Sequence, residues 1–130
     1  SNDLKENPKA AMCFHWKSLN RQIRILGSVT QVDDKEADLY FNSRSYESRI
    51  SAWASDQSNT MKERSELLEK IEDFKKKYKN EKNVPRPPHW SGWCLRPSSI
   101  EFWLHKDNRI HERLRYNRAG NDWKKEILYP

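Results

Sequence analysis

Three polar side chains recur every four residues in the segment YFNSRSYES, residues 40–48. They are Tyr40, Arg44 and Ser48. Two turns of helix would bring residues at this spacing onto one side, where a phenol, a guanidinium and a hydroxyl could contact one ligand. Such a set suits a phosphate monoester, with arginine supplying the positive charge. The same spacing is also common among ordinary surface residues, so it predicts an anion site only together with other evidence.

A cationic pattern lies near the end of the chain, in NRIHERLRYNR at residues 108–118. Read as a strand with a period of two, one face of this segment carries Arg109, His111, Arg113 and Arg115. Because like charges this close repel, the pattern is unusual for a solvated strand face and leaves open what balances its charge. Solvent exposure is the competing interpretation for His111, since its neighbours on that face are cations rather than core residues.

Two shorter segments add polar groups that could contact a ligand. In RQIRI, Gln22 lies between Arg21 and Arg24, a pattern that is also typical of a half-exposed strand. In SDQS, Gln57 and Ser58 precede a long predicted helix, where a polar helix terminus is the ordinary interpretation. The chain has only three glycines, so a glycine-rich phosphate loop is excluded and any phosphate must be held by side chains.

The bulk composition narrows the class of protein. A chain of 130 residues is one domain by length, and its net charge of +6 favours a nucleic acid, a phosphorylated small molecule or a membrane surface as partner. No apolar run approaches the roughly 20 residues of a membrane span. No histidine pair has the spacing of a helical metal site, and no Gly-x-Ser-x-Gly motif is present. Cys13 and Cys94 fit no metal or redox spacing, so we expect reduced, buried thiols in a cytoplasmic protein.

Hydrophobic periodicity predicts a strand-dominated domain with helices inserted in the middle. The expected strands cover residues 9–16, 21–32, 92–97, 99–105, 109–116 and 122–130, with a turn at residues 97–98. The expected helices cover residues 36–43, 46–55 and about 60–80, and a proline-rich connector follows at 83–90. Asp33 with Glu36 indicates the first helix start, and Thr60 with Glu63 indicates the last.

Seven strings that occur in order along the chain carry a family resemblance. They are NPKAAMCFHW, LNRQIRI, YFNSRSYES, AWASDQS, VPRPPHW, IEFW and RIHERLRY. Together they resemble the C-terminal part of the pyridoxine (pyridoxamine) 5′-phosphate oxidases. The resemblance implies a mainly β fold with inserted helices: an FMN-binding split β-barrel, incomplete in this chain. We therefore expect residues 1–130 to be the C-terminal part of a single such domain, with a helical insertion at about 34–80.

The resemblance also implies an activity. The family oxidises pyridoxine or pyridoxamine 5′-phosphate to pyridoxal 5′-phosphate. We therefore expect a cytoplasmic, FMN-dependent oxidoreductase of vitamin B6 metabolism. The implied step is hydride transfer from the substrate C4′ to flavin N5, with O2 as the acceptor giving hydrogen peroxide, and ammonia from the amine. The family is a homodimer whose FMN sites lie at the subunit interface. Neither a nucleic acid nor a membrane is an expected partner.

Residue by residue, the matching motifs assign roles. Tyr40, Arg44 and Ser48 correspond to residues that hold the substrate phosphate. Arg109 and His111 correspond to the catalytic contacts with the substrate over the flavin. The positions that correspond to FMN contacts are Gln22, Gln57, Ser58, Trp103 and Arg113. The cationic face is thereby assigned two phosphorylated aromatic ligands, and Arg115, which inherits no role, is expected to face solvent.

Some positions depart from the family pattern, and two alternatives stay open. Ser45 stands where the family usually has Pro, Ser51 and Ser91 where it usually has Gly, and Cys94 where a basic residue is common. The chain opens with SNDLKENP, and the family's N-terminal strands that hold the FMN phosphate have no counterpart, so we expect the later part of a longer protein. The alternatives are a split-barrel flavoprotein with another substrate and a basic nucleic-acid-binding module.

Overall fold

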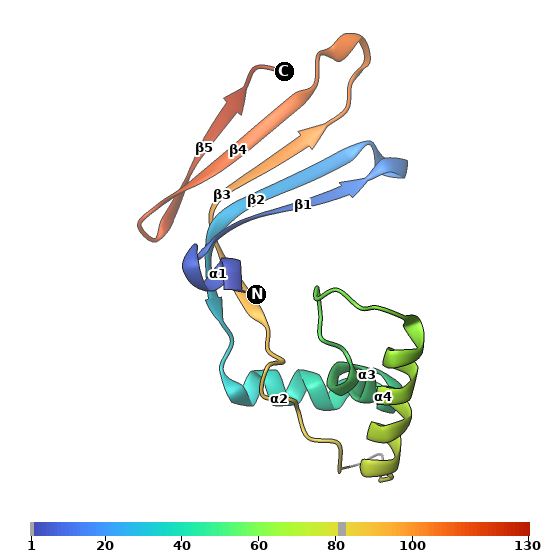
Figure 1. Cartoon of the computed structure of the whole chain (residues 1–130). Helices are drawn as coiled ribbons and strands as arrows, with labels where there is room; N and C mark the ends of the chain where they lie inside the picture. Colours follow the sequence, from blue (N-terminus) through green and yellow to red (C-terminus); the bar gives the residue numbers. More distant parts are fainter. Residues whose placement is uncertain (1, 81–82) are drawn as a thin grey trace. The chain divides into compact units, whose positions relative to one another are not determined.

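The computed structural model describes residues 2–80 and 83–130, which form two compact units (Figure 1). The first, here called the sheet unit, comprises residues 2–31 and 93–130. The second, here called the helical unit, comprises the described part of residues 32–92 and is inserted in the chain between the second and third strands.

The sheet unit is a five-stranded antiparallel sheet in the order β1-β2-β3-β4-β5 (Figure 1). A short helix, α1 (Asn2–Glu6), precedes it. The strands are β1 (Lys9–Trp16), β2 (Arg21–Gln31), β3 (Trp93–Leu104), β4 (Glu112–Ala119) and β5 (Asp122–Leu128). Within the described residues the sheet is open, because β1 and β5 do not pair with each other. The expected mainly β architecture with inserted helices is therefore present.

The third and fourth expected strands are one strand, β3, and the expected turn at Pro97 is wrong. Leu26 on β2 pairs with Ser99 while Gly27 pairs with Pro97, so Ser98 is the extra residue of a β-bulge. A bulge tolerates proline because the missing N–H is not needed there. Glycine is required opposite, because a Cβ on Gly27 would collide with the carbonyl oxygen of Arg96.

The start of β4 also differs from the expectation of a strand from residue 109. Residues 105–111 form the connection from β3, which contains a 3-10 turn at Asp107–Arg109. Asn108 and Arg109 have left-handed backbones, with φ of 58° and 61°. Arg109 therefore does not share a strand face with Arg113 and Arg115, and the four-cation strand face is wrong at its first position. His111 immediately precedes β4, and its ring lies 4.9 Å from that of Trp103, the residue paired with Arg113.

The two faces of the sheet differ in chemistry. One row of directly paired residues is wholly apolar and comprises Phe14, Ile23, Phe102, Leu114 and Ile127. Its neighbouring row, which points to the other side, comprises His15, Gln22, Trp103, Arg113 and Leu128. We call these sides the apolar face and the polar face. The apolar face is only partly covered in the described residues, since Phe14 is 42% exposed and Ile127 is 83% exposed.

The helical unit contains α2 (Asp34–Ser43), α3 (Tyr46–Ala54) and α4 (Arg64–Lys77) around its own small core. Phe41, Ile50 and Val84 form the buried centre, and Val84 belongs to the proline-rich connector. The side chain of Asp33 accepts a hydrogen bond from the N–H of Glu36 at 2.8 Å, which confirms the predicted first helix start. The residues packed against this core are Tyr46, Ala52, Trp53, Ile71, Phe74, Tyr78 and Trp90.

The predicted start of the last helix is wrong by three residues. Glu63, rather than Thr60, is the N-cap residue of α4, and its side chain makes no capping hydrogen bond. Residues 55–61 instead form an irregular loop with a turn at Gln57 and Ser58. Residues 55–61 are thus a separate loop, rather than the end of one helix and the start of the next.

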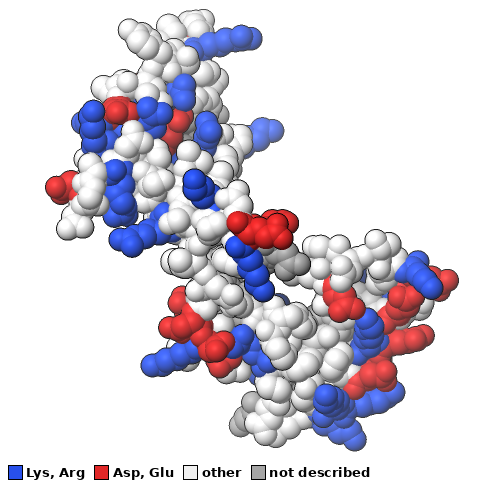
Figure 2. Space-filling model, turned by 60° about the vertical axis from the view of Figure 1, so that its left-hand side comes forward, with Lys and Arg blue, Asp and Glu red and all other residues white. Residues whose placement is uncertain are grey.

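The net positive charge of the protein belongs to the sheet unit. Its sequence carries 13 Lys and Arg against 7 Asp and Glu, whereas residues 32–92 carry 12 of each sign. Figure 2 shows basic side chains with few acids over the sheet unit, and both signs mixed over the helices. An anionic ligand is therefore attracted chiefly by the sheet unit at long range.

The exposure of the two cysteines differs from the sequence prediction. Cys13 and Cys94 are free as expected, but both are exposed rather than buried, because their strands are not covered on that side within the described residues. None of the described helices combines the length and the apolar character needed to cross a membrane.

Candidate functional site

Tyr40, Arg44 and Ser48 do not lie on one continuous helix, as their spacing predicted. Helix α2 ends at Ser43, and Arg44 is extended with φ of −78° and ψ of 153°. Ser45 then caps α3 by accepting a hydrogen bond from the N–H of Ser48. The cap interrupts the helix because a hydroxyl at this position satisfies a backbone N–H that a continuous helix would satisfy itself.

A tryptophan brings two of these residues together. The ring of Tyr40 stacks on Trp90 with centroids 6.0 Å apart, and the guanidinium carbon of Arg44 lies 5.3 Å from the centroid of the same indole. Nη1 of Arg44 is buried and has no hydrogen-bond partner among the described residues. A buried cationic donor without a partner is costly, so this guanidinium suits an anionic ligand that would complete its hydrogen bonds.

Ser48 adds a hydroxyl in the first turn of α3. Its Oγ accepts a hydrogen bond from the Ser45 hydroxyl at 2.9 Å, which leaves its own O–H available to donate. Ser45, where the family usually has proline, therefore orients a residue that was assigned to the substrate phosphate.

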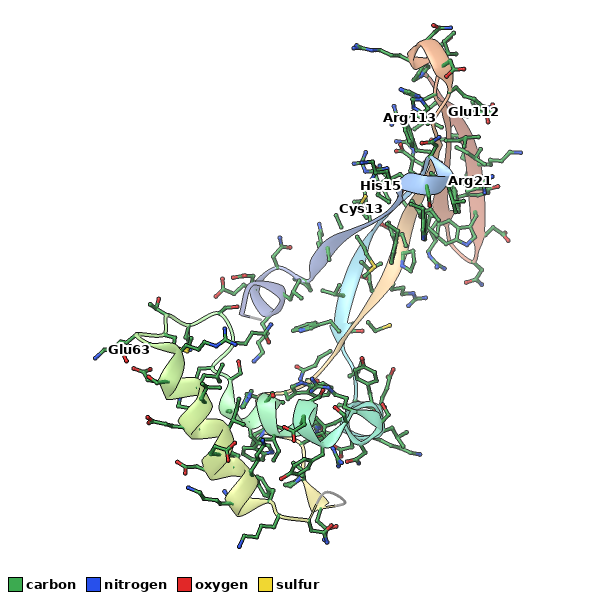
Figure 3. The ribbon with its side chains drawn as sticks, turned by 90° about the vertical axis from the view of Figure 1, so that its right-hand side faces the viewer. Cys13, His15, Arg21, Glu63, Glu112 and Arg113 are labelled. Atoms are coloured by element: carbon green, nitrogen blue, oxygen red, sulfur yellow. The ribbon has the colours of Figure 1, made fainter. Side chains whose placement is uncertain are left out.

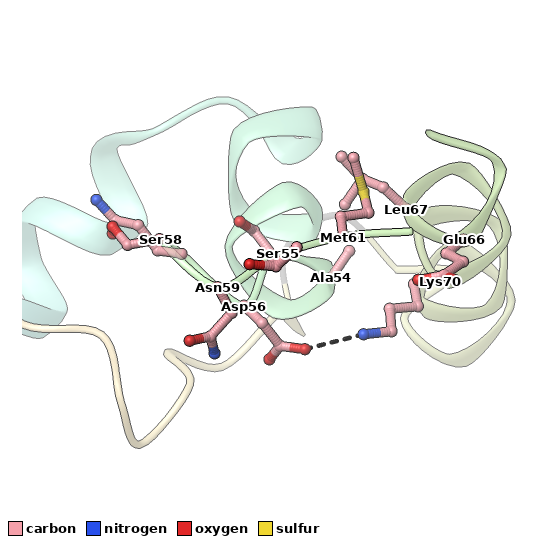
Figure 4. A pocket seen from close by; sticks show the side chains of 11 residues that line it. Ala54, Ser55, Asp56, Ser58, Asn59, Met61, Glu66, Leu67 and Lys70 are labelled. Carbon is pink, nitrogen blue, oxygen red and sulfur yellow. Dashed lines mark hydrogen bonds and ion pairs between the residues drawn. The ribbon is translucent and has the colours of Figure 1, made fainter. Parts of the chain in front are cut away.

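Gln57 and Ser58 lie on the loop that follows α3, where they line a pocket of about 210 Å³ (Figure 4). Ser58 has a left-handed backbone with φ of 69°. The pocket also contains an ion pair between Asp56 and Lys70, at 2.9 Å (Figure 4). The hydrogen bond from Lys70, together with its charge, lowers the pKa of the Asp56 carboxyl. Because Lys70 is already paired with Asp56, this loop can offer an anion only neutral donors, such as Gln57 and Ser58.

Three of the residues assigned to FMN lie side by side on the polar face of the sheet. Gln22 on β2 pairs with Trp103 on β3, and Trp103 pairs with Arg113 on β4. Their side chains point to the same side, because directly paired residues share a face. The row continues to His15 on β1, which pairs with Gln22 (His15 and Arg113 are labelled in Figure 3). An amide, an indole and a guanidinium in one row can together contact a planar aromatic ligand and its polar edge.

Arg113 and Arg115 on the polar face already have acidic partners. Nε of Arg113 donates to Glu101 at 2.9 Å, and Nη1 donates to the carbonyl oxygen of Tyr129 at 3.1 Å. Nη2 of Arg115 donates to Glu126 at 2.8 Å. The expectation that Arg115 simply faces solvent is therefore wrong. Carboxylates on the neighbouring strands, Glu101 and Glu126, balance part of the positive charge of β4.

His111 belongs to a cluster of three rings at the end of the polar face. Its ring lies 4.9 Å from Trp103 and 5.0 Å from His105, centroid to centroid. The N–H of Lys106 donates to Nδ1 of His111 at 3.3 Å. A neutral imidazole that accepts at Nδ1 carries its proton on Nε2, so His111 presents an N–H donor to a ligand. His111 is half-buried, so full solvent exposure is the wrong interpretation.

Arg109 is exposed in the same connection. Its left-handed φ of 61° is uncommon for a residue other than glycine, and such conformations are often kept at functional sites.

Sequence reasoning missed three residues that support the assigned ones: Trp90, Glu101 and His105. Trp90 and Glu101 lie within the strings VPRPPHW and IEFW, but their contacts depend on distant partners. No group of three or more His, Cys, Asp or Glu that could hold a metal ion occurs among the residues that the structure describes.

Two family models match the chain. One, described as "Pyridoxamine 5'-phosphate oxidase", matches residues 1–103. This chain belongs to the pyridoxamine 5′-phosphate oxidase family. The other model, described as "Pyridoxine 5'-phosphate oxidase C-terminal dimerisation region", matches residues 90–130. The family resemblance drawn from the seven strings is confirmed.

Curated relatives named "Pyridoxine/pyridoxamine 5'-phosphate oxidase" support the family assignment. The protein of Pelagibacter ubique is 60% identical over 99% of this chain and 62% of its own length. The protein of Caulobacter vibrioides is 48% identical over 98% of this chain and 57% of its own length, and that of Rhodospirillum rubrum is 49% identical over 98% and 63%. The chain thus spans about six-tenths of the length of these family members.

Solved structures support the fold of the family. PhzG from Burkholderia lata, in complex with tetrahydrophenazine-1-carboxylic acid, matches with a TM-score of 0.90 and 32% identity, over 99% of this chain and 62% of that one. An FMN-binding protein related to pyridoxamine 5′-phosphate oxidase from Nostoc punctiforme matches with a TM-score of 0.65 and 18% identity, over 99% and 66%. The second likeness concerns the fold alone. The split-barrel fold class is confirmed, with an open sheet in the described residues.

Proposed function

We propose that the protein containing this chain is an FMN-dependent oxidase of pyridoxine 5′-phosphate or pyridoxamine 5′-phosphate that forms pyridoxal 5′-phosphate. The observation that carries the proposal is the row of Gln22, Trp103 and Arg113 on the polar face. Three residues assigned separately from sequence motifs lie in register on adjacent strands. The resemblance covers both units, so we propose that they belong to one split-barrel domain with residues 34–80 as its helical insertion.

FMN is the cofactor that fits this donor set. The amide of Gln22 and the indole of Trp103 offer neutral contacts to the flavin ring, and Arg113 offers a charge that Glu101 holds in place. Gln57 and Ser58 offer further neutral donors from the loop after α3. When bound, FMN supplies the redox chemistry, accepting electrons from the substrate and passing them to O2 to give hydrogen peroxide.

The substrate assignment depends on a phosphate and a hydrogen-bonded ring. Arg44, with its unpartnered buried Nη1, would hold the phosphate together with Tyr40 and Ser48. His111 would donate its Nε2 proton to a polar atom of the substrate, and Arg109 would add a second contact. Both residues orient the substrate, and no protein nucleophile is needed for the oxidation.

The proposal includes a homodimer in the cytoplasm with FMN sites at the subunit interface. The homodimer is supported by the match of residues 90–130 to a family model whose description names a dimerisation region. The location and the interfacial FMN sites are proposed from the family resemblance alone.

A second candidate function is oxidation of a different aromatic substrate by the same fold. PhzG, which matches this chain with a TM-score of 0.90, is seen with tetrahydrophenazine-1-carboxylic acid, a ligand without a phosphate. A guanidinium can pair with a carboxylate as well as with a phosphate, so the two candidates differ in whether turnover requires a phosphate on the substrate.

The test is to purify the intact protein, record its flavin absorbance and measure hydrogen peroxide formation with pyridoxine 5′-phosphate, pyridoxamine 5′-phosphate and unphosphorylated pyridoxine. We expect a yellow protein that oxidises the phosphorylated compounds and discriminates against pyridoxine by at least about tenfold in kcat/KM. A colourless protein, or a yellow one inactive on both phosphates, would contradict the proposal.

A further inference from the structure

Trp90 occupies a central place in the helical unit that no sequence motif assigned. Its indole stacks with Tyr40 at 6.0 Å and lies 5.3 Å from the guanidinium carbon of Arg44. It also contacts the fully buried ring of Phe41 edge-on, with centroids 5.1 Å apart. One indole thus connects the hydrophobic core to both the phenol and the guanidinium.

The backbone of Trp90 is held from two sides. Its N–H donates to the carbonyl oxygen of Pro87 at 3.0 Å, and its own carbonyl accepts from Nη1 of Arg86 at 2.7 Å. Arg86 in turn pairs with Asp34 at 2.6 Å and Asp38 at 2.5 Å on α2. These contacts fasten the connector to the helix that carries Tyr40, so the indole is fixed relative to α2.

Contact with the Trp90 indole would raise the affinity of the Arg44 guanidinium for an anion. Arginine has many rotamers, and ordering them at the moment of binding weakens the affinity for the ligand. A guanidinium held on an indole face is ordered beforehand by a cation–π contact, while its N–H groups stay available to an anion. The unpartnered Nη1 of Arg44 is consistent with a donor that is oriented before its ligand arrives.

We propose that Trp90 is the positioning residue of the phosphate site, holding Arg44 and Tyr40 in the arrangement that binds a phosphate monoester. The inference rests on the proposed function, since it names the support of the same site. Trp90 acts through Arg44 and Tyr40 and needs no contact of its own with the substrate.

The experiment compares Trp90→Leu with Trp53→Leu in the FMN-loaded intact protein. Trp53 is a matched control, because it also packs against the core and carries a cation, Lys77, at 5.7 Å from its ring. We expect Trp90→Leu to raise KM for pyridoxine 5′-phosphate and the inhibition constant of inorganic phosphate at least about tenfold. FMN affinity and kcat/KM for unphosphorylated pyridoxine should stay within about twofold of the wild type. Trp53→Leu should lower the Tm without a phosphate-specific effect.

Two outcomes overturn the inference. One is an unchanged inhibition constant for inorganic phosphate in Trp90→Leu, and the other is an equal loss on phosphorylated and unphosphorylated substrates. If Trp90→Leu does not fold, Trp90→Phe decides, because phenylalanine keeps the core contact but is a weaker partner for a cation. A several-fold rise in the phosphate inhibition constant would then support the role, and no change would refute it. A wild-type protein that is inactive on phosphorylated substrates would instead defeat the proposed function itself.

Discussion

The two arginines assigned to phosphorylated ligands differ in what surrounds them. Arg113 is hydrogen-bonded to Glu101, so much of its charge is balanced within the sheet unit. Arg44 lies against the Trp90 indole, and no acidic partner of its guanidinium occurs among the described residues. The free charge for a phosphate dianion is therefore on Arg44, while Arg113 is better suited to a polar edge of the flavin.

At the residue scale, Arg44→Ala should damage substrate binding selectively. A charge-assisted contact of this kind contributes about 1.5–3 kcal/mol, so we expect a loss of at least about tenfold in kcat/KM for pyridoxine 5′-phosphate. Steady-state kinetics measure this, and the flavin absorbance should be unchanged. Unaltered kinetics would show that Arg44 does not hold the phosphate.

His111 and Arg113 should have separable effects. Replacing His111 with Ala removes a donor to the substrate, so kcat/KM should fall at least about tenfold while the Kd for FMN changes little. Replacing Arg113 with Ala should weaken FMN binding more than it lowers turnover of the flavin-saturated enzyme. Fluorescence titration of FMN together with kinetics at saturating FMN distinguishes the two. The assignment would be reversed if the His111 variant were the one that loses flavin.

At the scale of elements, the sequence predicts what is encoded locally. The bounds of β1, the cap at Asp33 and the helix from Tyr46 follow from alternation, capping chemistry and apolar spacing within a few residues. The continuity of β3 could not be predicted from local sequence, because the bulge at Ser98 arises from the pairing of β3 with β2. For the same reason, the row of Gln22, Trp103 and Arg113 could be assigned by motif, but its register could not be predicted.

The pairing of β4 with β5 should make stability depend on pH through Glu126. Hydrogen bonds from Arg115, helped by its charge, lower the pKa of the Glu126 carboxyl below its ordinary value of 4.5. A lowered folded-state pKa stabilises the protein above the unfolded-state pKa, and this contribution is lost as pH falls through the folded-state value. We expect Glu126→Gln to lower Tm at pH 7, and the difference from the wild type to shrink below pH 4.5 and to vanish once the pH lies below the lowered folded-state pKa. Thermal melts across this range test it; a pH-independent difference would contradict it.

At the scale of the whole molecule, the two faces of the sheet have different requirements. The polar face has its own ion pairs, whereas the apolar row leaves Phe14, Phe102 and Ile127 at least 41% exposed in the described residues. Exposed rows of this kind are usually covered in the assembled protein. The family model described as a dimerisation region spans residues 90–130, which include β5. We therefore expect a second copy of the chain to cover Ile127.

This expectation gives the last prediction. Ile127→Asp should weaken the dimer at least about tenfold, because burying one isoleucine contributes roughly 1.5–3 kcal/mol and an aspartate there would have to lose its hydration. Sedimentation equilibrium measures the dimer, and flavin titration shows whether FMN binding falls with it, as an interfacial site requires. Lys124→Ala, on the other face of the same strand, should leave both unchanged. An intact dimer with a lowered Tm would show that the row is covered within one protomer, which would contradict the dimer assignment for this face.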